Sequence, residues 1–176
     1  MYSKNSLQPI EVLHVLTTSI EYIKSTFSEN NLEINFNYSN IQKSNFNGLY
    51  VQGDKLLKNA FENILFNAIY HNEISNVQIL IKVSKVILKN NNFIKIEFVD
   101  NGVGITDARR KSIFQKGYEI QECLNEMGFR LTLVNKLIKK YNGYIWVEDT
   151  VKGDHKKGSN FAILIPEINE KPYILA

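Results

Sequence analysis

Hydrophobic residues recur every three or four positions in several stretches of the chain, which is the spacing of an amphipathic helix. We expect long helices over residues 11–30, 54–71 and 129–141, and a short one over residues 106–114. Thr106 is a suitable N-cap for the short helix, and Asn142-Gly143 is a typical C-cap for the last one. The chain thus offers about three long helices, each with one apolar face.

Other stretches show the alternation or the β-branched enrichment that is typical of strands. These are residues 32–36, 49–51, 77–88, 93–99, 144–148 and 160–165. Residues 89–92 are interpreted as a hairpin turn, and a polar Lys/Gly loop joins the last two strands. The order of elements predicts an α/β (α+β) two-layer sandwich, in which a mixed, mostly antiparallel sheet is covered on one face by about three helices.

The composition of the 176-residue chain fits one globular domain, with 44% hydrophobic and 22% charged residues. The formal net charge of +3 is too small to argue for nucleic-acid binding. No apolar run approaches the roughly 20 residues of a membrane helix. A single cysteine, Cys123, excludes an intramolecular disulfide. We therefore expect a soluble, cytoplasmic domain that contacts neither nucleic acid nor membrane.

Two asparagines on the second long helix are candidates for chemistry. Asn63 and Asn67 lie four residues apart on one edge of the apolar stripe. Asparagine disfavours a helix interior by several tenths of a kcal/mol relative to alanine. The two amide oxygens could hold a hydrated Mg²⁺, which prefers hard oxygen ligands. The alternative is a polar helix flank in an asparagine-rich chain.

A carboxylate is predicted on the apolar face of a strand. Strand alternation places Asp100 on the same side as Ile94, Ile96 and Phe98, where a charge is costly without hydrogen-bond donors. The glycines at positions 102 and 104 then permit tight turns and the close approach of a flat ligand. This arrangement suits an exocyclic amine such as that of adenine, or it is an ordinary Asp-Asn-Gly turn.

Two further segments carry weaker signals. Gly128 precedes a predicted helix, whose free N–H groups favour phosphate. A glycine turn delivers the Ser159 hydroxyl to the mouth of a strand. Neither segment is informative by itself.

The order and spacing of these segments are far more specific than any one of them. They are residues 61–68, 100–105, 113–114, 128 and 157–161. Together they resemble the ATP-binding catalytic domain of sensor histidine kinases (GHKL superfamily, Bergerat fold), which is related to gyrase B, the MutL repair proteins and a heat-shock chaperone ATPase. The resemblance runs from about Val51 to Pro166 and includes residues 142–149 and 151–154.

The resemblance implies a role for individual residues. Asn67 matches the asparagine that coordinates nucleotide-bound Mg²⁺, with Asn63 as a secondary ligand, and Asp100 matches the aspartate that receives the adenine amine. Ser159 matches a hydroxyl that helps hold adenine through water, and residues 115–127 match a mobile ATP lid. The full ATP-binding set implied in this way is Asn63, Asn67, His71, Asp100, Gly102, Gly104, Ile105, Phe114, Lys116, Gly128, Phe129, Arg130, Leu131 and Ser159.

The resemblance also implies a reaction, namely transfer of the γ-phosphoryl group of ATP to a histidine on a separate dimerisation domain, upstream of a response regulator. Hydrolysing relatives place a water-activating glutamate where this chain has Asn63, so the substitution favours phosphotransfer. None of His14, His71 and His155 resembles the acceptor motif, so we do not expect the chain to phosphorylate itself. We assign residues 1–10 to a linker or the tail of a dimerisation hairpin, 11–168 to the catalytic domain and 169–176 to a C-terminal tail.

Three positions depart from the family pattern. Glu126 and Arg130 stand where glycines are common, and Tyr70 replaces a lysine that often follows the Mg²⁺ asparagine. Arg130 either pairs with the triphosphate or belongs to a degraded lid. A degenerate nucleotide-binding or docking module and an anti-sigma-type serine kinase are therefore alternatives. An ATPase of the gyrase or MutL kind is disfavoured by Asn63.

Overall fold

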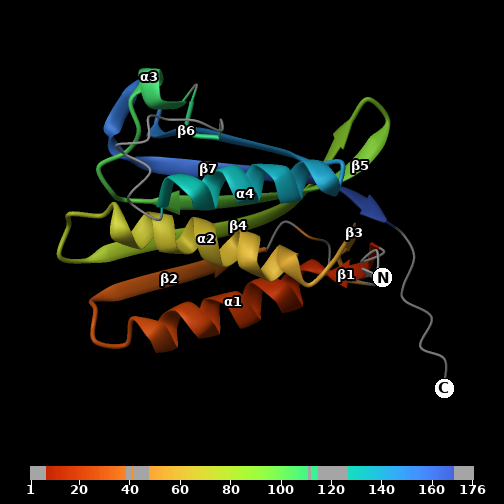
Figure 1. The fold of residues 1–176 in the computed structure, drawn as a ribbon, viewed down its shortest axis with the longest axis horizontal. Coiled ribbons are helices and arrows are strands. Elements are labelled where there is room, and N and C mark those ends of the chain that lie inside the picture. The colour runs from red at the N-terminus through yellow and green to blue at the C-terminus, as the bar shows by residue number, and fades with distance from the viewer. Residues whose placement is uncertain (1–6, 39–40, 42–47, 111, 115–126, 169–176) are drawn as a thin grey trace.

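Three helices lie side by side against one face of a seven-stranded sheet (Figure 1). The computed structural model describes residues 7–38, 41, 48–110, 112–114 and 127–168. In chain order the elements are β1 (Gln8–Glu11), α1 (Val12–Thr26), β2 (Leu32–Asn37), β3 (Tyr50–Gly53), α2 (Leu56–Tyr70), β4 (Val77–Leu88), β5 (Asn91–Asp100), α3 (Asp107–Arg110), α4 (Met127–Lys140), β6 (Tyr144–Val151) and β7 (Asp154–Ile168). The covering helices are α1, α2 and α4.

The sheet has the strand order β1-β3-β7-β5-β4-β2, and β6 pairs with β7 outside this path. β2 and β4 are parallel, whereas the other described pairs are antiparallel. β7 connects distant parts of the sheet, because its last two residues pair with β3 while residues 160–166 pair with β5. The predicted two-layer sandwich with a mixed, mostly antiparallel sheet is confirmed.

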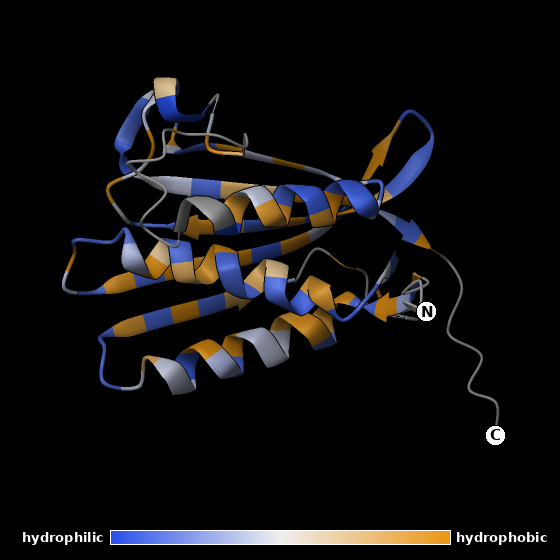
Figure 2. Ribbon diagram, in the orientation of Figure 1, coloured by the Kyte–Doolittle hydropathy of each residue, from blue (hydrophilic) through white to orange (hydrophobic). Residues whose placement is uncertain are grey.

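The core lies between the helices and one face of the sheet. Along β5, Ile94, Ile96 and Phe98 are buried, and the Phe98 ring centroid lies 5.8 Å from that of Phe61 on α2. Figure 2 shows hydrophobic and hydrophilic residues alternating along strands and forming separate stripes on helices. Burial of each side chain of this size stabilises the fold by about 1.5–3 kcal/mol. The alternation therefore fixes which face of β5 packs against the helices.

The predicted hairpin between β4 and β5 is present, but its turn is shorter than residues 89–92, because β5 begins at Asn91. Lys89 and Asn90 have φ values of 49° and 64°. Positive φ at both central residues is the signature of a two-residue type I′ hairpin turn, whose twist matches that of the flanking strands.

The structure corrects several predicted element bounds. Residues 8–11 form β1, although the sequence pattern predicts a linker up to residue 10. α1 ends at Thr26 rather than at residue 30, and α3 spans four residues instead of the nine expected for residues 106–114. The polar loop predicted between residues 149 and 159 is largely strand, because β6 continues to Val151 and β7 begins at Asp154. In β1 and in this hairpin, a partner strand supplies backbone hydrogen bonds that a local pattern does not reveal.

A buried carboxylate joins the start of α2 to the end of α4. Asp54 is 5% exposed, and its Oδ1 accepts hydrogen bonds from the Leu56 N–H at 2.9 Å and the Tyr141 hydroxyl at 2.6 Å. The Lys140 Nζ donates to Oδ2 at 2.6 Å. The Asp54 carboxylate thus occupies the turn before the helix, which explains why α2 begins at Leu56 and not at residue 54 as predicted.

We expect Asp54→Ala to lower the free energy of unfolding at pH 7 by about 3 kcal/mol. The change leaves the hydrogen-bond donors that converge on this carboxylate without an acceptor. Burial raises the pKa of Asp54, but the hydrogen bonds from Lys140, Tyr141 and Leu56 outweigh it and hold the pKa below its usual value. A carboxyl with a depressed folded-state pKa stabilises the fold above its unfolded pKa of about 3.9 and loses that contribution as pH falls through the folded pKa.

Urea unfolding of the wild type and the variant at several pH values measures this effect. The difference between them should be full at pH 7 and should shrink below about pH 4. Tyr141→Phe is the matched control, because it removes one donor and leaves the carboxylate, and it should lose only about 1 kcal/mol. An Asp54→Ala penalty that is the same at pH 3 as at pH 7 would contradict the assignment.

Candidate functional site

Asp100 is the last residue of β5 and lies on the buried face of the strand, as the alternation predicts, with 5% exposure. Its Oδ1 accepts hydrogen bonds from the backbone N–H groups of Gly102 at 2.8 Å and Ser159 at 3.1 Å. Its Oδ2 accepts one from the Ser159 hydroxyl at 2.6 Å. Burial raises the pKa of Asp100 above its usual value, and the hydrogen bonds from Ser159 and Gly102 oppose that rise. The site therefore holds a fixed acceptor inside an apolar setting.

The loop after Asp100 is pressed against neighbouring backbone, and this contact requires glycine at two positions. Gly104 has a φ of +69°, and a Cβ atom there would lie 1.5 Å from the His155 carbonyl oxygen. Gly158 has a φ of +100°, and a Cβ atom there would lie 1.9 Å from the Asp100 carbonyl oxygen. The loop of residues 101–105, called the glycine loop below, thus fits against the β6–β7 hairpin without side chains between them.

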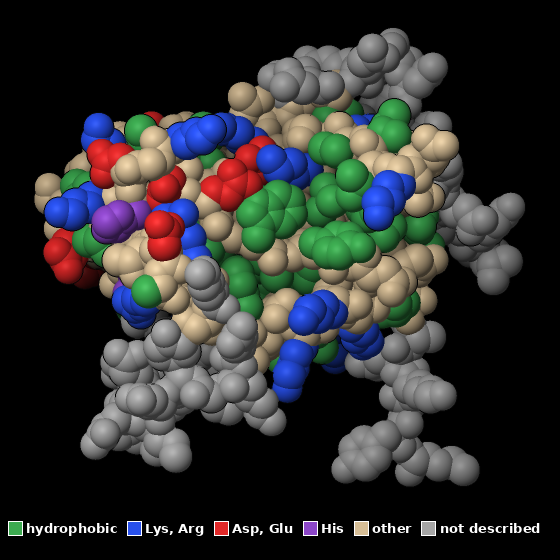
Figure 3. All heavy atoms as spheres, turned by 90° about the horizontal axis from the view of Figure 1, so that it is seen from above, with side chains coloured by type: hydrophobic (Ala, Val, Ile, Leu, Met, Phe, Trp, Pro, Cys, Tyr) green, Lys and Arg blue, Asp and Glu red, His purple; other side chains and the backbone are tan. Residues whose placement is uncertain are grey.

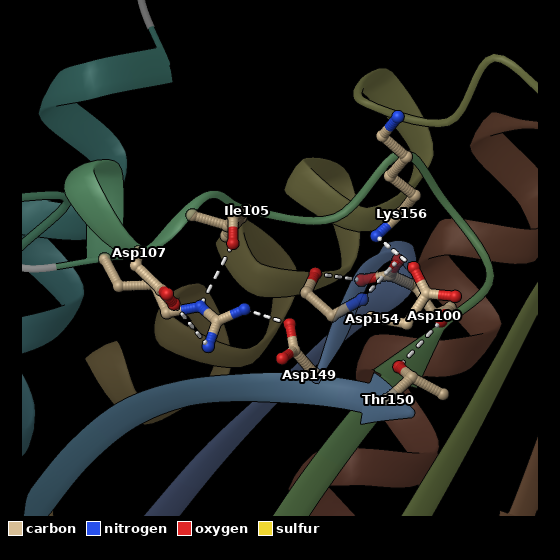
Figure 4. A network of polar contacts seen from close by, with 9 residues as sticks. Asp100, Ile105, Asp107, Asp149, Thr150, Asp154 and Lys156 are labelled. Atoms are coloured by element: carbon tan, nitrogen blue, oxygen red, sulfur yellow. Dashed lines mark hydrogen bonds and ion pairs between the residues drawn. The ribbon is translucent and has the colours of Figure 1, made fainter. Parts of the chain in front are cut away.

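A polar network holds α3 and this loop to β6 (Figure 4). The Arg110 guanidinium pairs with Asp149 and with Asp107, and its Nε donates to the Ile105 carbonyl at 3.0 Å. The Thr150 hydroxyl donates to the Asp100 carbonyl at 3.1 Å. The pairing of Arg110 with Asp149 was not predicted from the sequence, because the two residues are 39 positions apart and no local pattern joins them.

The end of α2 borders the same loop. The Asn72 amide donates to the Asn101 side-chain oxygen at 2.7 Å, and the His71 carbonyl lies 3.2 Å from the position that a Cβ atom on Gly102 would occupy. His71 is the C-cap residue of α2. Burial and the nearby Arg109 lower the pKa of His71, while Asp100 opposes this change. His71 is therefore close enough to Asp100 and Arg109 for their charges to affect it.

Asn63 and Asn67 lie one helical turn apart on α2, and both are half-buried. Within the described part of the chain, neither side-chain amide has a hydrogen-bond partner. The described residues also contain no cluster of three or more His, Cys, Asp or Glu that could hold a metal ion by themselves. A cation here would need amide oxygens together with oxygens from a ligand or water, which is a donor set that suits Mg²⁺.

Of the remaining residues of the predicted set, Phe114 packs against β7, and Gly128, Phe129 and Leu131 belong to α4. Phe114 is half-buried, with its ring edge-on to Phe161 at 6.2 Å between centroids. Leu131 is 3% exposed and belongs to the hydrophobic core. Gly128 and Phe129 lie in the first turn of α4, and Lys116 lies outside the described residues, as does the predicted lid apart from Met127.

One further predicted residue, Arg130, reaches from α4 to α2. Its guanidinium carbon lies 5.4 Å from the centroid of the Phe66 ring. Phe66 directly precedes Asn67 on α2. The structure thus brings a cation from the first turn of α4 to the helix that carries the asparagine pair.

The molecular surface at one end of the domain differs from that in the middle of the same face (Figure 3). Figure 3 shows basic, acidic and histidine side chains gathered at the end where α3 and the β6–β7 hairpin lie, whereas apolar side chains form a patch in the middle of this face. Among the described helices, none has both the length and the apolar character needed to cross a membrane.

A family model described as "Histidine kinase-, DNA gyrase B-, and HSP90-like ATPase" matches residues 53–169. This range contains every residue of the predicted ATP-binding set. It also contains the structural features described above, from the Asn63–Asn67 pair to the contact between Asp100 and Ser159.

Two curated relatives are named as a sensory kinase and a sensor protein. The adaptive-response sensory kinase SasA of Synechocystis is 24% identical over 161 residues, which cover 90% of this chain and 39% of SasA. The sensor protein CitS of Halalkalibacterium halodurans is 33% identical over 116 residues, which cover 66% of this chain and 19% of CitS. The chain therefore spans well under half the length of these relatives.

Solved structures share the fold at low sequence identity. The mycobacterial sensor histidine kinase MprB superposes with a TM-score of 0.74 at 18% identity, covering 92% of this chain and 97% of that one. The catalytic domain of the histidine kinase ThkA superposes with a TM-score of 0.72 at 18% identity, covering 92% and 95%. At this level of identity, the likeness establishes the architecture alone.

Proposed function

Because the chain belongs to the histidine kinase-, DNA gyrase B- and HSP90-like ATPase family, we propose that it is the ATP-binding catalytic domain of a sensor histidine kinase. In this proposal it transfers the γ-phosphoryl group of ATP to a histidine on a separate dimerisation domain, in the cytoplasm. The observation that carries the proposal is the buried Asp100 carboxylate, held by Gly102 and Ser159 beside the glycine loop.

Adenine recognition follows from the acceptors that Asp100 still offers. Each carboxylate oxygen has two lone pairs, and Oδ2 accepts only from Ser159 within the described residues. The second lone pair is available to an exocyclic amine. Gly102 leaves bare backbone next to the carboxylate, since even a Cβ atom there would lie 3.0 Å from Oδ1. A flat base would therefore be able to approach this edge of the sheet.

Asn67, with Asn63 as a secondary ligand, would hold Mg²⁺ through amide oxygens that have no partner in the described part of the chain. When bound, Mg²⁺ neutralises phosphate charge as the γ-phosphoryl group is transferred. The chain's own part is to fix the adenine at Asp100 and the phosphates along the flank of α2. This orients the γ-phosphoryl group toward an incoming nucleophile.

The surroundings of α2 support transfer to a partner rather than hydrolysis. The amide side chain of Asn63 cannot act as a general base to activate water. The neighbouring Glu62 is buried and paired with Lys58. An imidazole on a partner domain is already nucleophilic and needs no such base. The solved complex of ThkA with the response regulator TrrA, which this chain matches with a TM-score of 0.69, supports a response regulator as the next partner.

The proposal is tested by incubating the chain with ATP labelled in the γ-phosphate, Mg²⁺ and purified dimerisation domains from the source organism. We expect label on a dimerisation domain that is lost in acid and stable in base, because phosphohistidine is acid-labile. Asn67→Ala should abolish the transfer. Acid-stable label would instead indicate a serine kinase, and nucleotide binding without transfer to any acceptor would indicate a docking module.

A further inference from the structure

An aromatic cluster joins α1 to α2. It consists of Tyr22 on α1, the α1 C-cap residue Phe27, and Phe66 and Tyr70 on α2. The Phe66 and Tyr70 rings are stacked, with centroids 6.0 Å apart and an interplanar angle of 19°. Tyr70 is 53% exposed, so burial alone does not account for an aromatic residue at this position.

Each of two cations lies over a ring of this cluster. Lys58 Nζ lies 4.8 Å from the Tyr22 centroid, and the Arg130 guanidinium carbon lies 5.4 Å from the Phe66 centroid. Both distances are within the range of a cation–π interaction. Lys58 pairs with Glu62 on its own helix, whereas Arg130 comes from the first turn of α4.

The position of Phe66 on the helix makes the second pair significant. At 100° per residue, Phe66 lies 60° from Asn63 and 100° from Asn67 around α2. Its ring contacts Tyr22 on α1 and the α1 C-cap residue Phe27, while Arg130 reaches it from α4. Arg130 therefore lies at the helix face that carries the asparagine pair, and the ring restrains the guanidinium there.

We propose that Phe66, with Tyr70 stacked behind it, is a positioning residue that presents the Arg130 guanidinium to the phosphates of the bound nucleotide. This inference rests on the proposed function, because it assumes that the phosphates follow the Asn63–Asn67 flank. Arginine suits the task, since its planar fork can stack on an aromatic face and still donate to phosphate oxygens. The aromatic cluster thus gives Arg130 a defined orientation before the nucleotide arrives.

Calorimetric titration with ATP·Mg²⁺ and with adenosine separates the phosphate contribution from the base contribution. We expect Arg130→Ala to weaken ATP binding by about 10- to 100-fold, which is the usual effect of losing a charged hydrogen bond. Phe66→Leu should weaken it by about 3- to 10-fold, in line with a cation–π contact. Adenosine affinity should change less than about twofold in both variants, and the double variant should bind ATP no more weakly than Arg130→Ala.

Trp146→Leu is the matched control, because it also removes a ring that lies under a cation, Lys95, but Trp146 is on β6 and outside the aromatic cluster. It should leave ATP affinity unchanged. Equal losses of ATP and adenosine in Phe66→Leu, or additive losses in the double variant, would overturn the inference while leaving the proposed function intact. A wild-type chain that binds neither ligand would overturn the proposed function, and the inference with it.

A second measurement needs no variant of Phe66 and covers the case in which Phe66→Leu does not fold. In the wild-type chain, the Arg130 side-chain protons should show an upfield ring-current shift in the NMR spectrum and should move further when ATP·Mg²⁺ is added. Adenosine should not move them. Arg130 resonances at ordinary positions, or equal responses to the two ligands, would contradict the proposed orientation.

Discussion

Asp100→Asn is expected to abolish most adenine-nucleotide binding while the fold remains intact. The change replaces one carboxylate oxygen by an NH₂ group, which would face the exocyclic amine of adenine donor to donor. Loss of a charged hydrogen bond, together with a buried donor left unpaired, should weaken ATP binding by at least about 100-fold. The fold tolerates the change because the remaining oxygen can still accept from the N–H groups of Gly102 and Ser159. The Ser159 hydroxyl can turn to accept from the new NH₂ group.

Calorimetry with ATP measures the affinity, and circular dichroism checks the fold. Asp149→Asn is the matched control, because it removes a carboxylate of the same sheet edge that pairs with Arg110 rather than facing the base. It should weaken ATP binding by less than about tenfold, through loosening of the loop alone. If Asp100→Asn bound ATP as tightly as the wild type, the adenine assignment would be wrong.

Gly104→Ala is expected to have the second large effect, because two independent penalties act at this position. A φ of +69° costs a non-glycine residue roughly 1–2 kcal/mol. The new methyl group would also lie 1.5 Å from the His155 carbonyl oxygen, so the glycine loop or the β6–β7 hairpin must move. We expect a loss of at least about 3 kcal/mol in the free energy of unfolding, or a displaced loop with at least tenfold weaker ATP binding.

Gly153 provides the control for this prediction. It has a comparable φ of +82°, but nothing lies within 4 Å of where its Cβ atom would be. Gly153→Ala should therefore lose only the conformational part, about 1 kcal/mol, which corresponds to roughly 2–4 °C in the melting temperature. Thermal unfolding and calorimetry on both variants measure the difference. Equal effects at the two positions would mean that the close contact with His155 is unimportant.

The sequence predicted those parts of the site that depend on local periodicity. Period-two alternation along β5 placed Asp100 on the buried face, and helical spacing placed Asn63 and Asn67 one turn apart. Both patterns arise because one face of each element packs against the core. The roles of these residues in binding ATP and Mg²⁺ remain predictions.

Features that depend on distant partners were not predictable in this way. The ion pair between Arg110 and Asp149 joins α3 to β6, and β1 exists only because β3 offers it a ladder of hydrogen bonds. Tyr70 illustrates the same limit. In the sequence it stands out as a missing lysine, whereas the structure shows that it stacks on Phe66, the ring that lies beneath Arg130.

The long strand β7 has a mechanical consequence. Its last residues pair with β3, which in turn holds β1, and its residue 159 touches the Asp100 carboxylate. Ser159 and Ile168 are nine positions apart, or roughly 30 Å of extended chain at 3.3 Å per residue. A pull or twist applied just before β1 would thus travel along one stiff backbone to the opposite end of the domain. β7 thus links the N-terminal edge of the sheet to the Asp100 carboxylate by continuous extended backbone.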